Sequence, residues 1–210
     1  IAHDVPSGAS IATLIDLEFI RSTGSTNLVV QELSKALDKS LVNAGLGISE
    51  VKTALSFLMN DRRIIMVQGD FALDDIKRRL LNSGHVLQTF RDMQIYLGSE
   101  GNVALLGPGR LAIGEDFSNM EDLIATLKDG DTLALDVDLN RVLEMLNHGH
   151  YISITSQCEF VSSGCNALGF AAAIQTSGSA LFEMVAIFDN LEDAETGQRT
   201  FEAFAMVDPL

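Results

Sequence analysis

The sequence predicts an α+β fold, in which a mostly antiparallel sheet carries helices on one face. Short apolar runs separated by glycine or Asn-Asp turns are typical of antiparallel strands. The expected helices fall between groups of strands, which argues against a doubly wound parallel sheet. The first half also has the element order β-α-β-β-α-β, the split βαβ or ferredoxin-like order, and the second half is a looser echo of it.

Apolar runs of strand length predict strands at Ser10–Leu17, Val51–Met59, Arg63–Val67, Val86–Phe90, Met93–Leu97, Val103–Leu106, Arg110–Ile113, Tyr151–Ser156, Ala167–Gln175 and Ala180–Phe188. Apolar residues at helical spacing predict helices at Asn27–Ala44, Asp74–Asn82, Asn119–Leu127, Leu139–Leu146 and from Asp189-Asn190 to about Met206. Asn60-Asp61 and Thr176-Ser177-Gly178 mark hairpin turns, and Gly45 and Gly84 end helices. We expect a single domain over residues 1–210, with two packed ferredoxin-like halves of about 1–98 and 99–210 as the alternative.

The chain is acidic, with a formal net charge of −15, and the charge is unevenly distributed. Residues 1–91 hold 10 basic and 10 acidic side chains, whereas residues 92–210 hold 4 and 19. An acidic surface repels nucleic acid and anionic membranes, so neither is expected as a partner. The acidic half is either a well-solvated surface or a docking face for a cationic partner or divalent ions.

Hydrophobic residues make up 47% of the chain, which is enough for a core without a metal ion or a dense disulfide framework. The apolar runs are far shorter than the roughly 20 residues of a membrane-spanning helix, so we expect no such segment. The first residue is Ile1 rather than Met, so we expect that something upstream has been removed, either a signal segment or another part of a longer chain.

Cys158 and Cys165 have six residues between them and flank a Ser-Ser-Gly turn between two strand-like runs. This placement favours a disulfide that closes a hairpin-like loop, and therefore an oxidising compartment. The alternatives are two free thiols, or a thiol dyad of Cys165 with His148 or His150. Zinc is disfavoured because two further ligands at the usual spacing are missing.

Other motifs have structural explanations. His148-Gly149-His150 could bind a metal ion with His85, Asp136 or Asp138 as a third ligand, but a histidine at a helix C-terminus is favoured by the helix dipole alone. The aspartates from Asp129 to Asp138 fail the EF-hand pattern, and the cations Arg62, Arg63, Lys77, Arg78, Arg79 and Arg91 have no interleaved aromatic residues. We therefore expect no catalytic set, no cofactor and no metal.

Several motifs together resemble a known pattern. Gln68-Gly69-Asp70-Phe71 leads into Ala72-Leu73-Asp74-Asp75-Ile76, and Leu80, Gly84-His85, Thr89-Phe90-Arg91 and Ile95-Tyr96 follow. Leu111-Ala112-Ile113-Gly114, the two cysteines and Val5-Pro6 extend the match more loosely to about two thirds of the chain. The pattern resembles an uncharacterised family of bacterial exported proteins, many of them lipoproteins. The chain departs from it at Gly114-Glu115-Asp116, where the family more often has a Gly-Ser-Glu-Glu type of helix start.

The resemblance implies export and an α+β fold, and it assigns no functional residues. We therefore expect an extracytoplasmic, non-catalytic binding or protein-interaction module, such as the globular part of a lipoprotein. One alternative is a subunit of a larger assembly that docks through an apolar edge strand such as Ala167–Ile174. A second alternative is a hydrolase-type enzyme whose site is assembled from dispersed residues.

Overall fold

The structure is a computed structural model, and it describes residues 9, 11–22, 37, 39–130, 137–146, 149–174 and 180–205. The elements follow in the order β1 (Ile11–Asp16), α1 (Leu17–Ser22), the 3-10 turn η2 (Ile48–Glu50), β2 (Val51–Met59), β3 (Arg62–Gly69), α3 (Leu73–Asn82), β4 (Val86–Phe90), β5 (Met93–Gly98), β6 (Gly101–Gly107), β7 (Arg110–Gly114), α4 (Phe117–Asp129), α5 (Val137–Met145), β8 (Tyr151–Thr155), β9 (Cys165–Ile174), β10 (Ala180–Phe188) and α6 (Leu191–Ala205).

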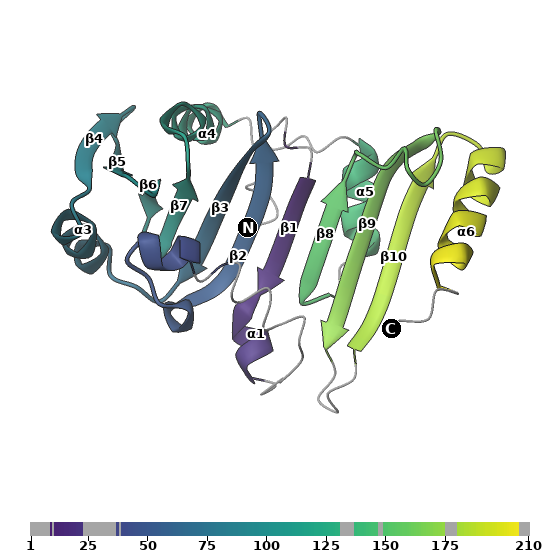
Figure 1. Ribbon diagram of the computed structural model, residues 1–210, viewed down its shortest axis with the longest axis horizontal. Helices are drawn as coiled ribbons and strands as arrows, with labels where there is room; N and C mark the ends of the chain where they lie inside the picture. Colours follow the sequence, from purple (N-terminus) through teal and green to yellow (C-terminus); the bar gives the residue numbers. More distant parts are fainter. Residues whose placement is uncertain are drawn as a thin grey trace.

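The strands form one 10-stranded sheet in the order β10-β9-β8-β1-β2-β3-β7-β6-β5-β4 (Figure 1). Neighbouring strands pair antiparallel, so the predicted α+β class with an antiparallel sheet is confirmed. β6 and β7, which follow residue 98, lie between β3 and β5, which precede it. Whether the chain folds as one unit or as two halves stays a prediction.

The ferredoxin-like arrangement of the halves was wrong, because in a split βαβ unit the two strands joined by a helix lie parallel with a third strand between them, whereas β1 and β2 pair directly and antiparallel. The strands that follow α3 pair with one another in a meander instead of lying beside β1, and short turns favour such hairpins. Asn60 and Asp61 both have left-handed φ angles, 51° and 59°, and so do Arg91 and Asp92, at 46° and 65°. Two-residue turns of this kind match the twist of paired strands and force them to lie antiparallel side by side.

Helices cover both faces of the sheet, so the expectation of helices on one face was wrong. On one face, α4 and α5 pack on the strands through Met120, Leu123, Ile124, Leu139, Val142 and Leu146. On the other face, the helical residues 39–43 and α3 pack through Leu41, Ile76 and Leu80. The central strands require this, because successive side chains of β3 point to opposite faces: Ile64 and Met66 lie in the first cluster, and Ile65 and Val67 in the second.

The remaining predicted elements agree with the structure to within a few residues at their ends. Most of the predicted helix Asn27–Ala44 lies outside the described residues, but residues 39–43 are helical and the chain turns at Ala44 and Gly45, as expected. The predicted turn at Thr176-Ser177-Gly178 and the predicted helix end at Met206 also lie outside them. In the described part of the chain, no helix is long and apolar enough to span a membrane.

Candidate functional site

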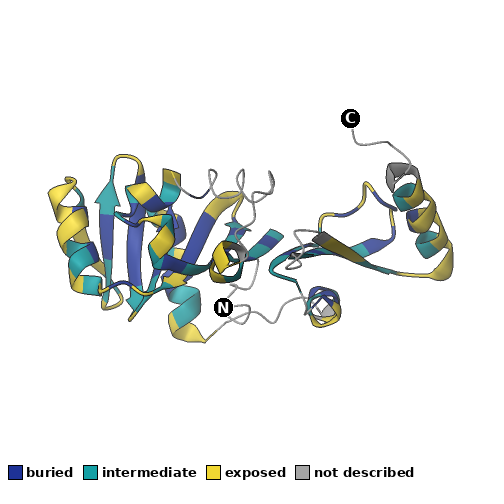
Figure 2. Ribbon diagram, turned by 90° about the horizontal axis from the view of Figure 1, so that it is seen from below, coloured by how far each residue is buried: buried dark blue, intermediate teal, exposed yellow. Residues whose placement is uncertain are grey.

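A row of exposed apolar side chains lies on β10, the last strand at one end of the sheet. β10 pairs with β9 and has no second neighbour among the described strands. Leu181 is 60% exposed, Phe182 58% and Met184 46%, although all three are large apolar side chains. Figure 2 shows this exposed strand at the outer end of the sheet. We call Leu181–Met184 the open half of β10.

An aromatic row leads from the sheet interior to the open half of β10. Strand register places Tyr151 and Phe182 on either side of Ala172, and Phe170 directly opposite Met184. The rings of Phe170 and Phe182 stack with centroids 5.6 Å apart, and Tyr151 meets Phe170 edge-on at 6.1 Å. Such contacts fix the orientation of the exposed Phe182 ring. The result is a preformed apolar surface that continues from the sheet face to its edge.

The opposite face of the same strands is covered by α5. Gly169 of β9 makes this close approach possible, because a side chain there would overlap Val142 and Leu146 of α5. Ala167 and Ala171, which also face this side, are buried for the same reason. On the aromatic-row side Phe182 and Met184 stay exposed, and on the α5 side Leu181, which lies opposite Ala173 at the start of β10, is also exposed.

The second half of β10 is held by α6 and the disulfide loop. Cys158 and Cys165 form the predicted disulfide and are buried with Val161, and Phe188 and Phe201 pack against them. The loop is tied to α6 because the Ser162 hydroxyl donates to Asp193 at 2.8 Å and the Thr200 hydroxyl donates to the Val161 carbonyl at 3.2 Å. Cys165 is thus bonded to Cys158 and offers no thiol for the dyad considered above.

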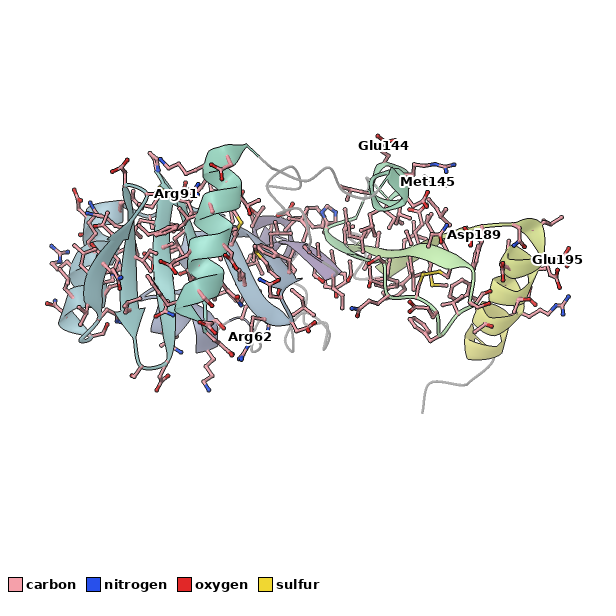
Figure 3. All side chains as sticks on the ribbon, turned by 90° about the horizontal axis from the view of Figure 1, so that it is seen from above. Arg62, Arg91, Glu144, Met145, Asp189 and Glu195 are labelled. Atoms are coloured by element: carbon pink, nitrogen blue, oxygen red, sulfur yellow. A yellow bond between two sulfur atoms is a disulfide. The ribbon has the colours of Figure 1, made fainter. Side chains whose placement is uncertain are left out.

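This end of the molecule is acidic and almost free of cations. Residues 142–198 contain no lysine or arginine, whereas seven Asp or Glu side chains fall in the same range. Asp189 and Glu195 lie at the α6 end, while Arg62 and Arg91 lie in the other half of the molecule (Figure 3). The cation Arg199 of α6 pairs with Glu195 at 3.8 Å. The stretch of chain that contains β10 therefore carries acidic side chains and neither lysine nor arginine.

The predicted metal ligands are not brought together by the described residues. His148 and Asp136 lie outside them. His150 stacks on Phe19 and lies 3.9 Å from Asp16, whose carboxylate caps α1 by accepting from the Phe19 N–H. His85 lies beside β4 and contacts Ser83 at 2.9 Å, and no group of three or more metal-binding side chains occurs in the described part of the chain. Ser83 donates to the Leu80 carbonyl, so this Ser-His pair serves the end of α3.

Several of the predicted basic side chains are engaged in ion pairs. Lys77 and Arg78 pair with Asp74 and Asp75 of their own helix, and Arg91 binds both carboxylate oxygens of Asp129 at 2.8 and 2.9 Å. A basic patch for an anionic ligand is therefore largely neutralised by neighbours. This agrees with the interpretation of these residues as a solvated helix face.

Arg79 links α3 to the turn before β2. Its guanidinium donates to the Gly45 carbonyl at 2.8 Å and to the Glu50 carboxylate at 2.9 and 3.1 Å. Burial alone would raise the pKa of Glu50, but the hydrogen bonds from Arg79 and from the Gly47 N–H outweigh burial and lower the pKa below its ordinary value of 4.5. The ionised pair therefore stabilises the folded state.

Arg79→Met should lower the free energy of unfolding by about 1 kcal/mol at pH 7, since the pair is partly exposed and screened by solvent. A carboxylate with a lowered pKa stabilises the fold above its ordinary pKa and loses that effect as the pH falls through the folded value. The difference from the natural protein should therefore shrink below about pH 4.5. Urea unfolding at pH 7 and pH 3 measures it, with the more exposed Arg78→Met as control. An equal difference at both pH values would contradict this account.

A polar hollow lies in the half of the sheet away from β10, beside β3, β7 and β6. It consists of two adjoining cavities of about 140 and 340 Å³ that share Asn43 and Glu100 in their walls. Lys39 and Arg63 line it together with Glu100 and Glu115. Since it presents both signs of charge in a small space, it favours no single class of ligand, and we assign it no function.

Comparison with known proteins identifies the fold. No protein-family model matches the sequence, and no curated protein matches it. The fold is similar to solved structures of TP0453, a Treponema protein. Crystal form I of TP0453 superposes with a TM-score of 0.61 at 10% identity over 96% of this chain and 85% of that chain. Crystal form III gives 0.57 at 9% identity over 90% and 80%. At this identity, the likeness to TP0453 shows a shared fold.

The structure also corrects one predicted docking strand. Ala167–Ile174 was expected to form an edge, but it belongs to β9, which lies between β8 and β10. Its small residues pack against α5, and Gly169 lies so close to Val142 and Leu146 that a side chain there would overlap them. The edge strand at this end is β10, whose apolar residues were visible in the sequence but whose position in the sheet was not.

Proposed function

We propose that this protein is an extracytoplasmic, non-catalytic module that binds another protein, and that it forms the globular part of a lipoprotein. The observation that carries the proposal is the open half of β10. Phe182 and Met184 are exposed side by side on one face of the strand and Leu181 is exposed on the other, and the outer side of the strand has no described neighbour. Contiguous exposed apolar surface on a folded domain marks an interaction site.

The location rests on covalent chemistry. A buried disulfide closes the loop that supports α6, and disulfides persist in oxidising compartments and are rare in the cytosol. The resemblance to exported bacterial proteins supports the same location. TP0453, whose fold is similar, is an outer-membrane-associated lipoprotein. The proposal includes attachment of this protein to a membrane through a lipid.

Site-specific photo-crosslinking tests the proposal. A benzophenone amino acid at position 182 of the full chain, irradiated in cells that make the protein, should yield an adduct that contains a second, different protein. The matched control is position 86 on β4, the strand at the other end of the sheet, where Val86 is 66% exposed. We expect the adduct from position 182 and not from position 86. No adduct from position 182, or equal adducts from both, would contradict protein binding by this surface.

A further inference from the structure

The backbone of β10 has an unused hydrogen-bonding side. In the part of the chain that the structure describes, no backbone hydrogen bond from residues 181–188 reaches anything beyond the ladder with β9. An edge strand in this state presents a row of N–H and C=O groups at strand spacing. The groups that complement such a row are those of another extended chain.

The open half of β10 lacks the devices that usually protect an edge strand. In natural proteins, proline, lysine or a β-bulge on an edge strand prevents pairing with other chains. Leu181–Met184 contains none of these, and its one charged side chain is Glu183. The only register shift between β9 and β10 lies at Ile187 and Phe188, where α6 and the disulfide loop already cover the strand. Among the described residues, only β9 pairs with the first half of β10, which leaves its outer edge to an added strand.

Charge selects the kind of strand. A second copy of this chain, paired antiparallel through Leu181–Met184, would bring Glu183 close to the same residue of its partner, in a protein of net charge −15. Like charges face each other at a cost, whereas a cationic segment is attracted to the lysine- and arginine-free range 142–198. The surface therefore favours a basic partner over self-association.

We propose that the open half of β10 binds an extended, basic segment of another protein by strand addition. The partner's backbone pairs with the outer side of β10. Its alternate apolar side chains lie against Phe182 and Met184, which continue the aromatic row of Tyr151 and Phe170. Its basic side chains lie toward Glu183 on the other face. Main-chain bonds supply affinity and the alternating side chains supply selectivity in this mode of recognition. This inference rests on the proposed function.

A defined peptide tests strand addition. The probe is a fluorescein-labelled nine-residue peptide of alternating lysine and valine, and its binding to the full chain is followed by fluorescence anisotropy. Phe182→Lys and Glu183→Lys should each weaken binding by about tenfold or more, because each adds a cation to the edge. Val86→Lys on β4 is the matched control and should leave binding unchanged. All three residues are exposed, and circular dichroism establishes that each variant is folded.

Two further peptides separate the parts of the inference. A version with every backbone nitrogen methylated can donate no backbone hydrogen bond from either edge and should bind weakly, and so should a version with glutamate in place of lysine. If the methylated peptide binds as well as its parent, strand addition is wrong. If the glutamate peptide binds equally well, the basic partner is wrong.

Three other outcomes would each reject the inference or part of it. A dimer in native mass spectrometry that Phe182→Lys abolishes would identify a second copy as the occupant and overturn the inference. Crosslinks from position 182 combined with unaffected binding of the methylated peptide would leave the proposed function intact and reject strand addition alone. Absence of crosslinks would reject the proposed function itself.

Discussion

Replacing both cysteines of the Cys158–Cys165 disulfide with alanine is expected to lower the free energy of unfolding by about 2–3 kcal/mol. The disulfide closes a short loop, and the chain-entropy account gives a value of this size for a loop of about eight residues. Both half-cystines are buried, so the change also removes packing around Val161 and Phe201.

The effect should be localised at the end of the sheet that carries the proposed site. The loop positions α6 because Ser162 and Thr200 connect the two and because Asn166 donates to Asp189 at 2.8 Å. Without the disulfide, the loop that these hydrogen bonds connect to α6 has more conformational freedom. Amide hydrogen exchange should therefore increase first in α6 and in the second half of β10, before β2 and β3 are affected.

Urea unfolding of the double variant measures the loss, and Ser163→Ala in the same loop is the control, since Ser163 is exposed. A change below about 0.5 kcal/mol for the double variant would contradict the supporting role of the loop. In cells, both cysteines should resist alkylation until a reductant is added. Free alkylation in unreduced cells would contradict the extracytoplasmic location.

Local features of the fold were predictable from the sequence because local chemistry determines them. Asn60-Asp61 tolerates left-handed backbone angles, so the hairpin of β2 and β3 could be placed correctly. The spacing of Cys158 and Cys165 around a turn predicted their pairing for the same reason. In both cases the partners are few residues apart, so no knowledge of the tertiary fold was needed.

The two faces of the sheet were harder to predict. The run Ile64-Ile65-Met66-Val67 is apolar at every position, which indicates a strand buried on both sides and hence helices on both faces. That signal was present in the sequence. The strand order was not, since the crossover through α3 sends β4 to the far end of the sheet, and no residue within α3 specifies how far it travels.

The candidate site illustrates the same limit. Ala167–Ile174 and Ala180–Phe188 are both apolar runs, and composition does not tell the inner strand from the edge. A clue lies in residue size, because the small residues of β9 admit α5 while the large residues of β10 fill no cavity. The absence of lysine and arginine from residues 142–198 marks the same region, but only the strand order joins the two observations into one surface.

Gly69→Ala should cause a larger loss, about 3 kcal/mol, within the motif that carries the resemblance to exported proteins. A side chain at Gly69 would overlap the carbonyl oxygen of Glu50 and lie 2.9 Å from the Val51 Cα. These are backbone atoms in a register shift between β2 and β3, so they cannot move aside as the end of a side chain would. The same carbonyl accepts from the Asp70 N–H at 3.0 Å.

The neighbours of Gly69 explain why the Gly-Asp-Phe pattern is structural. The Asp70 carboxylate pairs with Lys52 at 2.9 Å, and this hydrogen bond raises the pKa of the Lys52 ammonium. Phe71 is buried against Ile76 and Leu80 in the core cluster beneath α3. Gly69 and Asp70 therefore join the end of β3 to the start of β2, and Phe71 lies in the core cluster beneath α3.

Thermal and urea unfolding of Gly69→Ala test this interpretation, with Gly47→Ala as the matched control. Gly47 has an extended backbone, with φ −88° and ψ 147°, and an added side-chain atom there would have its nearest neighbours at 3.6 Å. The control should be neutral or stabilised by up to about 1 kcal/mol. A Gly69→Ala protein as stable as the control would show that this turn can relax.

The same variant separates folding from binding. If Gly69→Ala is destabilised but binds the lysine-valine peptide normally under conditions where it is folded, then the Gly-Asp-Phe pattern maintains the fold while the open half of β10 carries the binding. Those two roles occupy separate strands of one sheet. A protein that shares the Gly-Asp-Phe pattern therefore need not share the binding partner of the open half of β10.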